Sequence, residues 1–187
     1  MGDAGVTPGP GATALRLDAA LLVLLWLGAL VAWPSLPERI PYHLDPAGPD
    51  RWVAHDAGGL VVWLLLPILA TGTSLLLRAL SRYGADHPDI WSLPRKREFL
   101  ALDPAARTPV VAALRAMVGR TILATTLMIA VAQLALGLAA HGHEESANAV
   151  MYGAAALIVV IVVLSLRTMR TTGRLIESAS TSARGNG

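Results

Sequence analysis

The sequence predicts an all-α integral membrane protein, a four-helix transmembrane bundle with short extracytoplasmic loops. Three observations support this prediction. The chain is 54% hydrophobic and only 15% charged, whereas soluble domains carry about 25% charged residues. The apolar residues fall into four runs, each near the ~20 residues that a helix needs to cross a bilayer. The Lys and Arg residues gather on alternate connections between these runs, which is typical of a membrane topology.

Each apolar run should be a helix, because a chain segment in lipid must satisfy its own backbone hydrogen bonds. Together the four helices make one predicted domain, residues 15–177. The flanking segments 1–14 and 178–187 are rich in small and polar residues and are predicted to be disordered tails. The expected helices cover residues 17–36, 58–80, 108–140 and 147–166.

The third helix should be longer than the bilayer is thick. Thr108-Pro109 pairs a capping residue with a proline, a combination that favours a helix start. A helix from there to residue 140 spans roughly 50 Å at ~1.5 Å per residue, whereas the hydrocarbon core is ~30 Å thick. The first turns should therefore project from the membrane.

The basic residues predict the orientation. They concentrate between the second and third runs and after the fourth, which places both termini in the cytoplasm. We expect a multi-pass protein of a bacterial inner (plasma) membrane, with the lipid bilayer as its first partner. The basic segment Arg95, Lys96 and Arg97 is interpreted as ordinary positive-inside charge. The alternative is that Phe99 and its neighbours lie on an anionic membrane surface.

The connection between the first two runs is the most informative stretch. Four prolines fall between residues 37 and 49 and prohibit a regular helix. We expect a short, stiff cap on the outer end of the bundle, with Trp52 at the membrane interface. The residues of this cap that are expected to bind a ligand are Pro37, Ile40, Pro41, His43, Asp45, Gly48, Asp50 and Trp52.

This stretch carries a resemblance. The pattern P-x-x-I-P-x-H-x-D-x-x-G-P-D-x-W, at residues 37–52, resembles the signature of a bacterial membrane family with a domain of unknown function. That domain occurs at the amino end of immunity proteins against a sporulation-delaying peptide toxin. The segment W-x-x-P-x-K-x-x-F-L-x-L, at residues 91–102, resembles a second element of such proteins. The resemblance implies a membrane fold and an outer loop that meets a peptide or protein ligand.

A second constellation suggests a metal site. His43 and Asp45 lie two residues apart and so point the same way in an extended segment, and His141 and His143 share this spacing. Imidazole nitrogens and carboxylate oxygens are suitable ligands for Zn²⁺, which usually takes four in structural sites. The alternative is that these histidines are solvated loop residues. Apart from this Zn²⁺ hypothesis, no cofactor is expected.

Several function classes are disfavoured. The chain has no cysteine, which excludes disulfides and thiolate chemistry. Nucleic acid is not an expected partner, because the basic residues sit at the ends of apolar runs. No nucleophile motif or phosphate loop is present, so no enzyme is expected.

We therefore expect a non-enzymatic membrane protein of immunity or signalling type. It would sense or sequester an extracytoplasmic ligand and answer to a cytoplasmic protein partner. The alternatives are a metal-dependent sensor or transporter that uses the outward histidines, and a structural subunit of a membrane complex.

Overall fold

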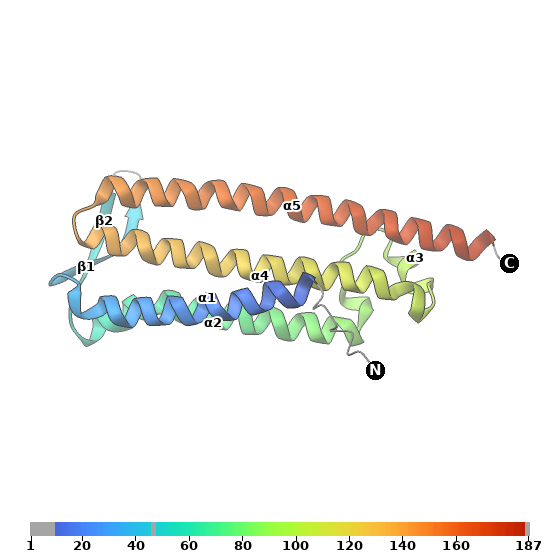
Figure 1. Ribbon diagram of the computed structural model, residues 1–187, viewed down its shortest axis with the longest axis horizontal. Coiled ribbons are helices and arrows are strands. Elements are labelled where there is room, and N and C mark those ends of the chain that lie inside the picture. Colours follow the sequence, from blue (N-terminus) through green and yellow to red (C-terminus); the bar gives the residue numbers. More distant parts are fainter. Residues whose placement is uncertain (1–9, 46–47, 186–187) are drawn as a thin grey trace, which may run out of the picture.

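The computed structural model describes residues 10–45 and 48–185. Four helices in this part of the chain are long and apolar enough to cross a membrane, which confirms the predicted membrane bundle. They lie side by side in an elongated molecule (Figure 1). The long helices are α1 (Pro10–Ala32), α2 (Ala57–Asp86), α4 (Pro104–Ala140) and α5 (Glu144–Gly185).

Both terminal helices extend into the predicted tails. α1 begins at Pro10, inside the predicted tail 1–14, and ends at Ala32, followed by the single 3-10 turn η1 (Trp33–Ser35). α5 continues to Gly185, so this helix extends into the predicted tail 178–187. Residues 1–9 and 186–187 lie outside the described part. α5 remains helical because Ile176, near its end, is fully buried against other helices.

α4 confirms the expected long third helix. It begins at Pro104, with Asp103 as its N-cap residue, and Pro109 lies within it rather than at its start. Its 37 residues span about 55 Å at ~1.5 Å per residue, well beyond the ~30 Å of hydrocarbon. α5 accompanies it, so both helices extend past the bundle toward the short helix α3 (Lys96–Ala101) (Figure 1).

A small core joins α3 to this extension. Phe99 is 0% exposed, so its ring packs inside the protein and not against lipid. The Arg107 side chain donates to the carbonyl oxygens of Leu102, at 2.7 Å, and Leu100, at 2.6 Å. It thereby satisfies carbonyls that the end of α3 leaves open. The buried residues of this core are Phe99, Leu102, Val110, Leu114 and Ile176.

The connection from α2 to α3 folds back on α2. It contains the 3-10 turn η2 (Pro88–Ile90), after which Trp91 packs against Gly84. The Trp91 indole donates to the Gly84 carbonyl oxygen at 2.7 Å. A Cβ at Gly84 would lie 2.8 Å from the indole ring, so the close contact requires glycine there.

The connection between α1 and α2 is a β-hairpin, which the sequence did not predict. β1 (Arg39–Asp45) pairs antiparallel with β2 (Gly48–Ala54). The register is irregular between Pro41 and Leu44, as in a β-bulge. Prolines are tolerated because each strand of a two-stranded sheet has an edge that needs no partner. The hairpin lies at one end of the bundle, beside the turn between α4 and α5; we call this the hairpin end (Figure 1).

Candidate functional site

The hairpin is anchored to the bundle through its apolar residues. Ile40 of β1 is 1% exposed and packs in a cluster with Ala29 of α1, Leu36 and Trp63 of α2. Leu44 packs against a second cluster formed by α4 and α5. Burying a side chain such as Ile40 contributes about 1.5–3 kcal/mol. The hairpin therefore lies firmly across the end of the bundle.

The exit of the hairpin into α2 is equally tight. Asp56 caps α2, since its Oδ1 accepts a hydrogen bond from the Gly59 N–H at 2.9 Å. A Cβ built on Gly59 would lie 2.0 Å from the Ala54 carbonyl oxygen, so only glycine fits beneath the end of β2. Next to it, the rings of Trp33 and His55 meet edge to face, with centroids 4.2 Å apart. These contacts fix both ends of the hairpin.

The outer surface of the hairpin carries aromatic and charged side chains. Tyr42 is 45% exposed and Trp52 is 37% exposed. His43 Nδ1 and Asp50 Oδ1 lie 2.6 Å apart across the strands, and the Arg51 guanidinium lies 3.9 Å from Asp50. The hydrogen bond with His43 holds the pKa of the Asp50 carboxyl below its ordinary value. The surface thus combines two aromatic rings with a hydrogen-bonded pair of polar side chains.

The predicted ligand-binding residues divide into three groups by burial. Three of them hold the hairpin in shape: Ile40, Pro41 and Gly48 are buried, and Gly48 has φ +120°, a value that favours glycine. Pro37, before β1, and Asp45, at its end, are half-buried. The members of the predicted set that are exposed are His43, Asp50 and Trp52.

The structure does not bring the predicted metal ligands together. His43 pairs with Asp50 instead of pointing with Asp45 toward a common centre. Both ring nitrogens of His141 face backbone carbonyl oxygens, at 2.8 and 3.2 Å, and His143 is exposed. Within residues 10–45 and 48–185, no three His, Asp or Glu side chains are grouped closely enough to hold a metal ion.

A buried polar cluster was missed by the sequence interpretation. Asp18 of α1 is 0% exposed. Its carboxylate accepts hydrogen bonds from Ser74 at 2.7 Å, Arg78 at 2.6 Å and Thr126 at 2.6 Å. Arg78 also donates to the Leu15 carbonyl oxygen at 3.0 Å. The Asp18 cluster therefore ties α1 to α2 and α4 inside the bundle.

The sequence held a weak signal for this cluster. Asp18 interrupts the start of the first apolar run, and Arg78 stands near the end of the second. Because consecutive spanning helices are antiparallel, these two positions come to the same end of the bundle. The Arg78 guanidinium pairs with the Asp18 carboxylate inside the bundle. Ionisable groups inside membranes are costly and mark function or close packing.

The basic segment lies at the opposite end from the hairpin. Arg95 precedes α3 with φ 57° and lies 3.5 Å from both Glu98 and Glu177, the latter in α5. Lys96 and Arg97 are exposed. Since Phe99 is anchored in the core below, α3 presents these two cations on a fixed support.

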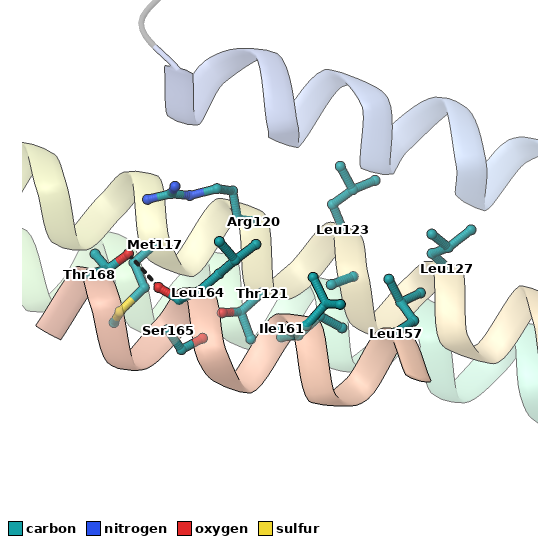
Figure 2. Close-up of a pocket in the computed structure, with 12 residues that line it drawn as sticks. Met117, Arg120, Thr121, Leu123, Leu127, Leu157, Ile161, Leu164, Ser165 and Thr168 are labelled. Atoms are coloured by element: carbon teal, nitrogen blue, oxygen red, sulfur yellow. Dashed lines mark hydrogen bonds between the residues drawn. The ribbon is translucent and has the colours of Figure 1, made fainter. Parts of the chain in front are cut away.

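A cavity of about 220 Å³ is lined by residues of α4 and α5, whose side chains Figure 2 shows as sticks. Most of its walls are apolar. Two of its polar residues bond within their own helices, because the Thr168 hydroxyl donates to the Leu164 carbonyl oxygen at 2.9 Å and Arg120 Nε donates to the Ala116 carbonyl oxygen at 3.2 Å. Thr121 and Ser165 are the other polar residues of its lining.

Comparison with known proteins places the hairpin in a recognisable unit. Residues 20–70 match the family model described as a domain of unknown function (DUF1648). The match confirms the predicted resemblance to a family with a domain of unknown function, and it covers the second half of α1, the hairpin and the first half of α2. No match was found among curated proteins or among solved structures.

Proposed function

We propose that this multi-pass membrane protein is non-enzymatic and receives an extracytoplasmic peptide or protein ligand on its hairpin. The observation that carries the proposal is the contrast between the two sides of the hairpin. One side is locked to the bundle by Ile40, while the other presents Tyr42, Trp52 and the His43–Asp50 pair. Tyr, Trp and Arg are enriched where binding energy concentrates in protein interfaces. A rigid support lowers the entropic cost of binding.

The charge distribution supports an outward-facing hairpin. Lys and Arg are frequent between α2 and α4 and after the apolar part of α5, and the turn between α4 and α5 has none. Under the positive-inside rule this distribution favours a hairpin end outside the cell and both termini in the cytoplasm. We assign the protein to a bacterial plasma membrane on this basis.

The resemblance of residues 37–52 to immunity proteins favours a secreted peptide as the ligand. The protein would then sequester the peptide or signal its arrival. For signalling, the exposed Lys96 and Arg97 on α3 are suited to an acidic cytoplasmic partner, because they stand on a fixed support connected to α4 and α5.

A protection assay tests the proposal. A peptide-sensitive bacterium expressing the chain is exposed to a panel of secreted, membrane-active peptides. We expect increased tolerance to at least one peptide, and a loss of about tenfold or more in the Tyr42→Ala/Trp52→Ala double variant, since hot-spot aromatics are worth ~2 kcal/mol or more. Tyr152→Ala is the matched control, because Tyr152 is 67% exposed and belongs to α5, outside the two hairpin strands.

Membrane levels of each variant are compared by immunoblot. The proposal fails if no peptide distinguishes expressing from non-expressing cells. It also fails if the hairpin variant protects as well as the parent protein does at equal membrane levels.

A further inference from the structure

We propose that a cavity between α1 and α4 binds a single-chain amphiphile through the side-chain amide of Gln133. The cavity has a volume of about 490 Å³, within the ~300–1,000 Å³ typical of small-molecule sites. At the hairpin end it is bordered by His141 and His143. Residues from α1 and α4 that form its apolar walls include Leu21, Leu24, Leu25, Gly28, Ala130 and Leu134.

Gln133 is one of the residues that line this cavity. The residue is 6% exposed, and both amide atoms, Nε2 and Oε1, are buried without a hydrogen-bond partner among the described residues. It lies eight residues before His141, or about 12 Å deeper along α4 at ~1.5 Å per residue. An unpaired amide at such a depth is unfavourable, because lipid chains supply no partner. A ligand in the cavity removes this cost if the flexible side chain turns its amide toward the cavity and pairs with the ligand.

The open donor and acceptor define the ligand chemistry. Nε2 needs an acceptor and Oε1 needs a donor, and an amide supplies both from adjacent atoms. An ester carbonyl satisfies only Nε2. The backbone of a partner helix is a poor match, because its amides already bond within the helix. The structure therefore points to an acyl chain that carries an amide, with the chain along the walls and a polar end toward His141 and His143.

This inference goes beyond the proposed function and does not depend on it. The exposed face of the hairpin is separate from the Gln133 cavity, so Trp52→Ala should leave the cavity intact. The two proposals can fail independently.

Photolabelling in lipid nanodiscs tests the site. The probes are a photoreactive fatty N-methylamide and the methyl ester of the same chain, and labelled peptides are mapped by mass spectrometry. We expect labelling of α1 and α4 around Gln133, with the amide favoured about tenfold over the ester because one additional buried hydrogen bond is formed.

Two substitutions distinguish the contribution of the cavity volume to labelling from that of the Gln133 amide. Gln133→Leu should retain labelling but lose the preference for the amide. Gly28→Leu should fill the cavity and lower labelling about tenfold, because a Cβ at Gly28 meets nothing within 4 Å and Gly28 lines the cavity. Gly72→Leu is the matched control, since Gly72 on α2 is equally unobstructed and lies outside the cavity.

The source of the amide is distinguished in a second arm, in which lipids are extracted from the protein purified from its native membrane. A co-purifying amide-linked lipid that is absent from Gly28→Leu identifies a membrane source, whereas labelling by the free fatty N-methylamide without any such lipid favours a free amphiphile. The proposal is overturned if labelling covers α5 as strongly as α1 and α4. Unchanged labelling in Gly28→Leu, or an amide preference that survives Gln133→Leu, also overturns it.

Discussion

Asp18 shows how one residue organises three helices. Its carboxylate holds Ser74, Arg78 and Thr126 in the interior of the bundle. Removing one partner of a buried ion pair leaves the other charge uncompensated, which typically costs about 3–5 kcal/mol. We therefore expect Asp18→Ala to lower the free energy of unfolding by about 3 kcal/mol in detergent titrations.

The double variant Asp18→Leu/Arg78→Leu tests the cause of that loss. Replacing a buried ion pair by apolar residues is often neutral, so the double variant should be more stable than Asp18→Ala. If the double variant is less stable than Asp18→Ala, the Asp18 cluster is not held together by charge compensation.

The His43–Asp50 pair makes a prediction about pH. The pKa of Asp50 is lowered chiefly by its hydrogen bond with His43, so the pair favours the folded hairpin when Asp50 is ionised. This contribution is present above the ordinary carboxyl pKa of 3.8 and is lost as the pH falls through the lower folded value. In NMR titrations of labelled aspartate, His43→Ala should raise the pKa of Asp50 toward its ordinary value. An unchanged pKa would contradict the assigned cause.

At the scale of the elements, the hairpin depends on a close approach at Gly59. A Cβ there would lie 2.0 Å from the Ala54 carbonyl oxygen, whereas a Cβ at Gly72 in the same helix meets nothing within 4 Å. Gly59→Ala should therefore displace β2 and cost about 1–3 kcal/mol. Gly72→Ala should be neutral or stabilising by up to ~1 kcal/mol. Equal thermal stability of the two variants would show that the hairpin is not packed against the start of α2.

The helices could be predicted because each apolar run is itself the signal. The ends of the helices could not be predicted, because contacts between residues distant in the sequence determine where a helix ends. Ile176, for example, packs against α3 and α4 beyond the predicted end of the fourth helix. The hairpin escaped prediction since its prolines hide the alternation of a strand. For the site, His43, Asp50 and Trp52 were predicted as outward residues. The buried cluster around Asp18 was not predicted, because its partners come from helices that meet only in the folded bundle.

At the scale of the whole molecule, the two ends of the bundle have different characters. The hairpin end carries the hairpin and the turn before α5, and the opposite end carries α3 with its exposed cations (Figure 1). An extracytoplasmic ligand on the hairpin requires that these two ends lie on opposite sides of one membrane, with the hairpin outside. The absence of native cysteines allows single-cysteine labelling without a background.

The most direct test compares two exposed serines, Ser146 beside the hairpin and Ser92 before α3. Ser146→Cys should react with a membrane-impermeant maleimide in intact cells, and Ser92→Cys should react only after the membrane is permeabilised. Labelling of Ser92→Cys in intact cells, with Ser146→Cys protected, would place the hairpin in the cytoplasm and contradict an extracytoplasmic ligand.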